Sequence, residues 1–270
     1  MPVKRIFPQL ATGAITQYPL RIQERFRTLV NQLGDGRRIR YSDVGASALE
    51  WEVSHQGLSD DEWLTMEGLF RECEGRRYPF LFLDPWSNLI ADSETFVSAS
   101  WTKEPGIGLA EGLTDPEGGP RATQATNTAA TLQSVAQTVA IPAWFQYSFS
   151  VYARSNQAGQ MRLIASTDGA FAERLFELSS DWQRYPLFSA MTAYTEMVQV
   201  AIQIPAGAAI EIFGAQLEAQ PSPSPYQRNG LRTGRYPEAR FAGDTLAQTS
   251  TGPGEHSTSI RIRSQVVAYS

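Results

Sequence analysis

The first third of the chain alternates hydrophobic and polar residues in a way that predicts strands around one helix. From Arg38 to Val53, apolar residues recur at odd positions, the period of two expected of a half-buried strand. These positions are Ile39, Tyr41, Leu49, Trp51 and Val53. Gly45 interrupts the run, so the sequence predicts an antiparallel strand pair with its bend at Gly45.

The next segment carries the signals of a helix that begins after Ser59 and runs from Asp61 to Glu74. Ser59 can cap the helix, and Glu62, three residues on, can bond back to the cap amide. Apolar residues then recur every three or four positions, at Trp63, Met66, Phe70 and Cys73. Gly75 ends the helix, and the apolar run Tyr78 to Leu83 predicts a short buried strand.

Beyond Trp86 the helical patterns stop and short strand-like runs follow one another, which favours an antiparallel sandwich. The predicted strands cover Trp144–Tyr152, Met161–Ser166, Arg174–Leu178, Trp182–Phe188, Met197–Ile204 and Ala209–Leu217. Pro221 to Pro225 alternates proline with serine, which is typical of a stiff, extended connector.

The last segment, Ser257 to Tyr269, alternates Ile260 and Ile262 with Arg261 and Arg263 and predicts one more strand. A lone strand needs partners, and we expect it to return to the sheet of the first domain. The predicted organisation is mainly β. A discontinuous β-sandwich with one helix covers 1–87 and 227–270, an inserted antiparallel jelly-roll sandwich covers 88–220, and a Pro/Ser connector covers 221–226.

Composition limits the classes of molecule that we expect the chain to bind. The chain has 270 residues and a net charge of −5, which gives no electrostatic reason to expect nucleic-acid binding. The local cluster Arg37, Arg38 and Arg40 is interpreted as a solvated or subunit-facing turn. We find no apolar signal core near the N-terminus and no run of about 20 apolar residues, so we expect a soluble protein without membrane insertion.

The chain lacks the motifs of common enzyme classes, and we expect it not to be an enzyme. A Gly-x-Ser-x-Gly elbow, a phosphate-binding Gly-rich loop and a His-Glu-x-x-His helix are all missing. The two histidines, His55 and His256, are expected at the surface, and the single cysteine, Cys73, on the buried helix face. Two carboxylates suffice for glycoside hydrolysis, and the candidates are Glu173, Glu177, Glu196 and Glu211.

The first domain resembles the hub proteins of phage tail tips. The resemblance rests on Gly34-Asp35-Gly36-Arg37-Arg38, the strand Leu49-Glu50-Trp51, the helix, and the ending Phe82-Leu83-Asp84-Pro85-Trp86. This pattern is similar to the lambda-type minor tail protein M and the distal tail proteins of long-tailed phages. The resemblance implies a structural subunit that forms a homo-oligomeric ring, with tail tube, tail-tip and baseplate proteins as partners and the virion tail as its location.

The second domain resembles jelly-roll carbohydrate-binding modules. The resemblance rests on Trp101-Thr102-Lys103, Phe149 to Arg154, Trp182-Gln183-Arg184 and Ile210 to Glu218. It implies that exposed aromatic rings bind a host-surface polysaccharide. The candidates are Trp101, Trp144, Trp182 and Tyr185, with Tyr152 as a further aromatic residue.

The same resemblance implies no cofactor other than a structural calcium ion, to which Asp168 and Glu218 could offer oxygen ligands. Two hypotheses follow for the whole chain. The first is a structural tail-tip subunit decorated by the jelly roll. The alternative is a glycan-binding adhesion protein whose N-terminal domain is only an anchor.

Overall fold

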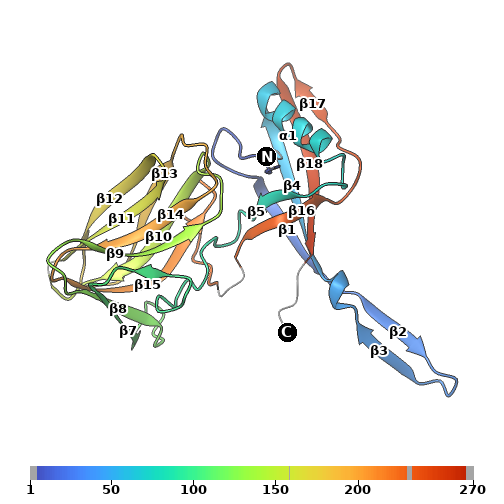
Figure 1. Cartoon of the computed structure of the whole chain (residues 1–270). Coiled ribbons are helices and arrows are strands. Elements are labelled where there is room, and N and C mark those ends of the chain that lie inside the picture. The colour runs from blue at the N-terminus through green and yellow to red at the C-terminus, as the bar shows by residue number, and fades with distance from the viewer. Residues whose placement is uncertain (1–4, 158, 230–232, 266–270) are drawn as a thin grey trace. The chain divides into compact units, whose positions relative to one another are not determined.

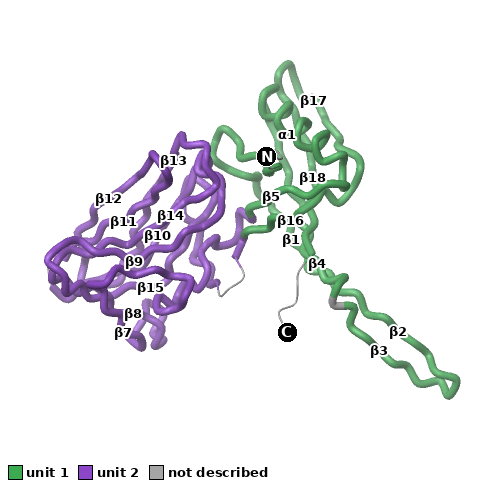
Figure 2. Tube along the Cα trace, in the orientation of Figure 1, with its two compact units in different colours: residues 1–83, 235–270 green, residues 84–234 purple. Residues whose placement is uncertain are grey.

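The computed structural model describes residues 5–157, 159–229 and 233–265, with the helices and strands shown in Figure 1. The chain divides into two compact units (Figure 2). Unit 1 comprises Met1–Leu83 and Arg235–Ser270, and unit 2 comprises Asp84–Gly234. Unit 2 therefore extends beyond the predicted insertion of 88–220 at both ends and contains the predicted connector, 221–226.

The sheet of unit 1 joins segments from both ends of the chain. Its order is β1-β4-β18-β16-β5, and β17 pairs with β18 at one end. The strands are β1 (Gln17–Arg25), β4 (Ala48–Leu58), β5 (Phe80–Leu83), β16 (Arg235–Phe241), β17 (Thr249–Gly252) and β18 (Glu255–Gln265). Ile260 and Ile262 of β18 lie opposite Val53 and Trp51 of β4, and all four side chains are buried. The end of the predicted last strand, 266–269, lies outside the described residues.

Trp51 is at the centre of the aromatic core of unit 1. Its ring lies 5.0 Å from that of Phe82 and 4.5 Å from that of Tyr236, both in edge arrangements. Phe7 packs edge-on against Phe82 at 5.6 Å and is itself buried. Such contacts add to the free energy gained by burying large aromatic surfaces, so the N-terminal segment, β4, β5 and β16 share one core.

Helix α1 (Asp60–Glu72) confirms the predicted cap. Ser59 accepts a hydrogen bond from the Glu62 amide, and Glu62 accepts one from the Ser59 amide, which completes the capping box. Trp63, Met66 and Cys73 are buried, as the apolar spacing predicts, and burial raises the pKa of the Cys73 thiol to about 11. Within the described part of the chain, no helix has the length and apolar character needed to span a bilayer.

The predicted strand pair from Arg38 to Val53 is wrong. β3 (Arg38–Ser42) pairs with β2 (Thr28–Gln32) in a separate hairpin, and a short 3-10 helix (Val44–Ala46) lies between β3 and β4. The turn after Leu33 closes this hairpin locally, and its Gly36 has a φ of +85°. Every residue of β2 and β3 is exposed, so alternation in β3 does not mark a buried face.

The surface placement predicted for His55 is also wrong. His55 is 1% exposed, on the core side of β4, and its Nε2 lies 2.9 Å from the Ile15 carbonyl oxygen. Its Nδ1 is buried and has no partner among the described residues. Burial lowers the pKa of His55, because the charged imidazolium loses hydration there.

Unit 2 is an antiparallel sandwich of two five-stranded sheets, which confirms the predicted mainly β fold with a jelly-roll domain. The first, here called the β10 sheet, has the order β13-β10-β15-β8-β7, and the second, the β11 sheet, has the order β12-β11-β14-β9-β6. The bounds are β6 (Thr102–Lys103), β7 (Ile107–Leu113), β8 (Ala122–Asn127), β9 (Gln133–Val139), β10 (Gln146–Arg154), β11 (Gly159–Thr167), β12 (Ala170–Leu178), β13 (Gln183–Ala190), β14 (Val198–Ile204) and β15 (Ala209–Glu218).

All six strands predicted in this region match β10 to β15, whereas β6 to β9 are not among the predictions. The missed strand β8 faces the core with small or polar side chains such as Ala125 and Thr123. Small residues give little strand propensity.

Tyr226 anchors the segment after β15 onto the outer face of the β10 sheet. Its ring lies 5.6 Å from Phe213 and 6.2 Å from Tyr152. Its hydroxyl lies 2.8 Å from Ser93 Oγ and donates to Glu94 at 3.3 Å. Burial raises the pKa of Tyr226 well above its ordinary value, so this phenol stays protonated as part of the packing of unit 2.

Unit 1 is expected to lose stability as the pH falls, because the unfolded chain protonates His55 more readily than the folded chain does. The folded pKa lies below the unfolded value, so the stabilisation is complete above about pH 7.5 and declines below about pH 6.5. His55→Gln removes this titration. Denaturant unfolding at several pH values should show a smaller acid-induced loss in the variant than in the parent. Parallel pH profiles would contradict this assignment.

Gly214→Ala should destabilise unit 2, since Gly214 has a φ of +62° and an added Cβ would lie 3.1 Å from the Tyr226 ring. The backbone strain alone is worth about 1–3 kcal/mol. Gly118→Ala is the matched control, because Gly118 has a φ of +86° but no atom within 4 Å of the added Cβ. Urea unfolding should show the larger loss of free energy of unfolding in Gly214→Ala. Equal losses would refute a role for the Tyr226 contact.

Candidate ligand-binding site

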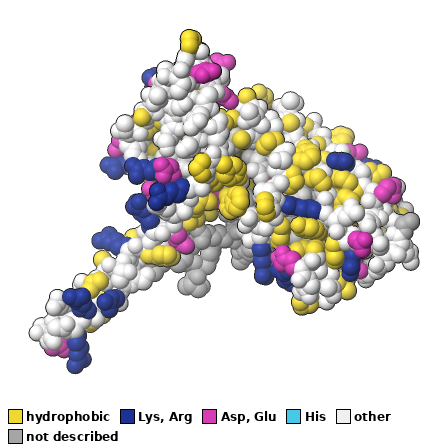
Figure 3. Space-filling model, turned by 180° about the vertical axis from the view of Figure 1, so that it is seen from behind, with side chains coloured by type: hydrophobic (Ala, Val, Ile, Leu, Met, Phe, Trp, Pro, Cys, Tyr) yellow, Lys and Arg dark blue, Asp and Glu magenta, His cyan; other side chains and the backbone are white. Residues whose placement is uncertain are grey.

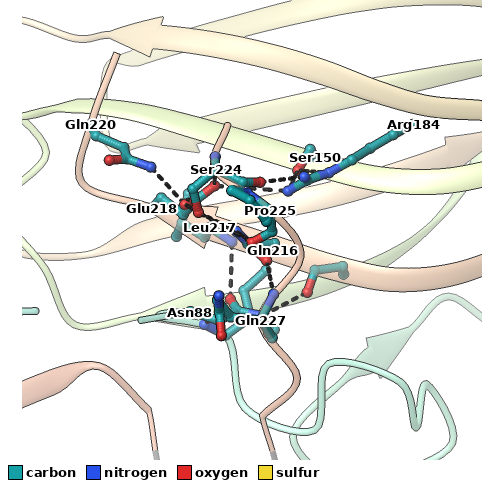
Figure 4. A network of polar contacts seen from close by, with 12 residues as sticks. Asn88, Ser150, Arg184, Gln216, Leu217, Glu218, Gln220, Ser224, Pro225 and Gln227 are labelled. Carbon is teal, nitrogen blue, oxygen red and sulfur yellow. Dashed lines mark hydrogen bonds and ion pairs between the residues drawn. The ribbon is translucent and has the colours of Figure 1, made fainter. Parts of the chain in front are cut away.

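The outer face of the β10 sheet is covered near β15 by the chain's own polar network (Figure 4). Glu218 has a side chain only 1% exposed, and its carboxylate accepts hydrogen bonds from the amide and hydroxyl of Ser224. Arg184 lies 3.8 Å from this carboxylate, donates to Ser150 Oγ, and also donates to the Ser224 carbonyl oxygen. The predicted connector is therefore bound against the sheet.

The network continues toward the start of unit 2. Gln216 accepts a hydrogen bond from the Gln227 amide at 2.6 Å. Asn88 donates to the Ala215 carbonyl oxygen at 2.8 Å and accepts from the Leu217 amide at 3.0 Å. Each of these polar groups has a protein partner, so this part of the β10 sheet has few free groups to offer a ligand.

The carboxylates considered for glycoside hydrolysis are in most cases already paired. Glu211 lies 2.7 Å from Arg154, and Glu173 lies 3.2 Å from Arg162. Glu177 accepts from Gln160 at 2.6 Å on the exposed face of β11 and β12. Glu196 lies outside the strands, just before β14. Their ion pairs with arginine suit a structural role for Glu211 and Glu173.

Two of the four predicted aromatic residues are buried. Trp101 is 5% exposed, packs on Phe96 at 4.9 Å, and donates from Nε1 to the Asp92 carbonyl oxygen. Tyr185 is 7% exposed and packs on Phe176 at 5.1 Å. Alternation along β13 places Tyr185 on its inner face, so neither ring offers a face to a ligand.

The third predicted residue, Trp182, is half-buried and has one ring face covered by its own chain. The Arg154 guanidinium lies 4.8 Å from the ring centroid, and Trp182 Nε1 donates to the Thr114 carbonyl oxygen at 3.2 Å. A guanidinium over the ring is a favourable cation–π contact. A sugar would have to displace it to stack on that face.

Trp144 differs because it adjoins an open tyrosine. Its ring lies 5.9 Å from that of Tyr194, with 35° between the ring planes, and Tyr194 is 89% exposed. The loop of Tyr194 is tied down by the Ala143 amide, which donates to the Thr195 carbonyl oxygen at 2.8 Å. Thr167, at the end of β11, donates to the Met197 carbonyl oxygen at 2.6 Å. The two rings therefore stand on loops that are fixed to the end of the β11 sheet.

Tyr194 was missed by the sequence analysis. It stands in the loop between β13 and β14, outside any periodic pattern. The one sequence feature that could have pointed to it is its aromatic character in a segment between two predicted strands. Binding residues often stand on loops that a rigid scaffold positions, which makes this exposed ring a candidate for ligand contact.

A row of uncharged side chains crosses the outer face of the β11 sheet at the same end. Register pairs Phe171 with Ser166, Ser166 with Gln199, and Gln199 with Thr138. Phe171 is 70% exposed, and Met197 on the adjoining loop is 51% exposed. We call Trp144, Tyr194 and this row the Tyr194 site. It combines apolar ring surface with hydroxyl and amide groups, which is the chemistry that binds sugars.

The residues considered for calcium do not come together. Asp168 lies in the turn between β11 and β12, whereas Glu218 is buried on the β10 sheet and bonded to Ser224. Among the residues that the structure describes, no group of three or more His, Cys, Asp or Glu side chains is placed to hold a metal ion. The donor set of Asp168 and Glu218 therefore does not fit a shared calcium ion.

Comparison with known proteins found similarity among solved structures alone. No family model matches the chain, and no curated protein does. The CBM22-1 xylan-binding domain of Xyn10C from Paenibacillus barcinonensis is 10% identical, with a TM-score of 0.40, over 54% of this chain and 98% of that chain. TmCBM61, solved with β-1,4-galactotriose, is 13% identical, with a TM-score of 0.39, over 48% of this chain and 97% of that chain. The enzymatically active domain of tailspike protein 4 from bacteriophage CBA120 is 10% identical, with a TM-score of 0.39, over 51% of this chain and 22% of that chain.

Proposed function

We propose that unit 2 binds carbohydrate at the Tyr194 site. The observation that carries this proposal is the Trp144–Tyr194 ring pair, one of whose members is 89% exposed. Sugar rings present C–H groups on one face, which pack on aromatic rings, and hydroxyl groups at their edges, which need polar partners. Ser166, Gln199 and Thr138 supply such partners on the outer face of the β11 sheet, at the end where Thr167 is hydrogen-bonded to the loop of Tyr194.

The site favours a neutral saccharide. Its row of side chains, Phe171, Ser166, Gln199 and Thr138, has no charged member. Arg162 and Glu173, which lie farther along the same sheet, neutralise each other at 3.2 Å. An acidic sugar would gain no ion pair from the row. The hydroxyl groups of a neutral oligosaccharide would form hydrogen bonds with the amide and hydroxyl groups of the row.

Tyr194→Ala should weaken binding of a neutral oligosaccharide by about tenfold or more, as loss of one stacking ring costs about 1.4 kcal/mol or more. The ligand would be chosen on a glycan array and its affinity measured by calorimetry. The variant should unfold at the temperature of the parent, because this exposed side chain contributes little to the core.

Phe188→Ala is the matched control, since Phe188 is 47% exposed but belongs to the other sheet, on the edge strand β13. This control should bind like the parent. Equal loss in both variants, or full binding by Tyr194→Ala, would reject the Tyr194 site.

We infer a second function from one further observation, the exposed β2–β3 hairpin. It would act as an assembly arm of a ring-forming subunit at a phage or phage-like tail tip, with tail tube and baseplate proteins as neighbours. Leu29 and Tyr41 pair on one hairpin face and are 42% and 49% exposed, with Ile39 on the same face. Val30 and Arg40 pair on the other face, and Figure 3 shows basic side chains, all of them arginines in this segment, along the hairpin.

A two-stranded hairpin with an exposed apolar face is marginally stable alone in water, and a partner that covers this face would bury Leu29, Ile39 and Tyr41. This supports assembly as a function of unit 1. In that case unit 2 would present the Tyr194 site at the periphery of the assembly.

Leu29→Thr with Tyr41→Thr should abolish self-association, because it removes apolar surface from the proposed interface while threonine, a β-branched residue, still favours a strand. The oligomeric state would be measured by mass photometry and ring formation by negative-stain imaging. Val30→Thr, on the opposite face, should leave assembly unchanged. A parent chain that stays monomeric and forms no ring would contradict this second function.

A further inference from the structure

The outer face of the unit 1 sheet carries charged side chains in register. One row runs Arg21, Glu52 and Arg261 across β1, β4 and β18. The next row runs Gln23, Glu50, Arg263 and Arg240 and continues onto β16. The opposite side of these strands holds the apolar core of unit 1, so this face is a distinct surface.

The two arginines of β18 have no side-chain partner among the described residues. Glu50 is held by Arg25 at 2.9 Å, and Glu52 lies 3.9 Å from Arg21. Within the described residues, both acidic residues on β4 therefore form ion pairs with arginines of β1 and none with the arginines of β18. The guanidinium groups of Arg261 and Arg263 form no ion pair or hydrogen bond within the described residues, and both side chains are exposed.

Arg263 also lies directly opposite a second arginine, Arg240. Like charges in directly opposed positions destabilise a sheet. Arg240 is held in place because it donates to the carbonyl oxygens of Arg76 and Arg77. The pair therefore keeps two positive charges side by side, an arrangement that an anion would relieve.

Two hollows adjoin these arginines. Arg261 lines one of about 230 Å³ together with Arg21 and Arg25. Arg263 lines a larger one of about 560 Å³ together with Arg240, Arg76 and Gln265. Positive charge and a concave surface therefore occur at the same place, because the wall of each hollow contains a guanidinium of β18 that has no partner among the described residues.

We propose that this face binds an acidic segment of a partner protein, laid in extended form along β18. Alternate side chains of an extended chain are spaced by about 6.6 Å, the same spacing that separates Arg261 from Arg263. Carboxylates at alternate positions would each meet one guanidinium, which pairs well with a carboxylate in a bidentate manner. Gln265 would bond the backbone or a polar side chain of the segment.

The same face is a poor match for a nucleic acid. Glu50, Glu52 and Glu238 stand among the arginines and would repel a continuous row of phosphates. The carboxylates of a peptide are separate groups and can lie away from these three acidic residues. An acidic peptide therefore fits this arrangement of charges better than a nucleic acid does.

The test uses the full chain and a labelled decapeptide of alternating Glu and Thr, with a Gln–Thr decapeptide as the neutral probe. Arg261→Gln with Arg263→Gln should weaken binding of the acidic peptide at least tenfold by fluorescence anisotropy, and added salt should weaken parent binding. The neutral peptide should bind neither protein.

Arg38→Gln with Arg40→Gln is the matched control, since it removes the same charge at the same spacing from the exposed strand β3. It should retain the affinity of the parent. Equal loss in both double variants would show unspecific attraction and overturn the proposal. Tighter binding of a single-stranded oligonucleotide or of inorganic triphosphate than of the acidic peptide would overturn it in favour of a phosphate ligand. None of these outcomes depends on sugar binding or on ring formation.

Discussion

The pairing of β4 with β18 is the constraint on which unit 1 depends. β4 contributes Trp51 and Val53 to the core, and β18 covers their flank with Ile262 and Ile260. These strands are separated in sequence by the whole of unit 2. Contacts between distant segments form late because chain closure costs entropy first. Unit 2 is synthesised before β18, so the sheet of unit 1 cannot be completed until the sandwich has emerged.

Unit 2 uses its two outer faces differently. On the β10 sheet, Glu218, Arg184 and Gln216 are satisfied by the chain that follows β15. On the β11 sheet, Ser166, Gln199 and Thr138 remain on an open surface beside Tyr194. A buried polar network is stable only when each member is satisfied, which explains why the chain after β15 closes the first face.

Local sequence signals predicted the parts of the fold that local forces decide. The capping box at Ser59 and Glu62, the alternation in β18 and the strands from β10 to β15 each follow from short-range patterns. The pairing of β3 failed because Ile39 and Tyr41 show the same alternation as buried residues, although no second layer covers them. Whether a second layer covers a strand depends on contacts between segments that are distant in sequence. The same long-range packing buries His55.

The candidate site was predicted only in part for the same reason. Trp144 was identified by residue type, but its partner Tyr194 lies far along the chain and meets it only through folded loops. Trp101 and Tyr185 have the same chemistry and are buried. Residue type can list aromatic candidates, whereas exposure depends on which face of the sandwich each strand presents.

The two junctions of unit 2 lie next to each other, since Leu83 and Arg235 are cross-strand neighbours in β5 and β16. The Asp84 amide donates to the Gly234 carbonyl oxygen at 2.8 Å, so the first and last residues of the sandwich are joined directly. Removing unit 2 and linking these ends by a short turn would leave β5 and β16 as an ordinary hairpin. The sandwich is thus attached at one point of the unit 1 sheet, where it can be removed or exchanged without breaking the pairing of β5 with β16.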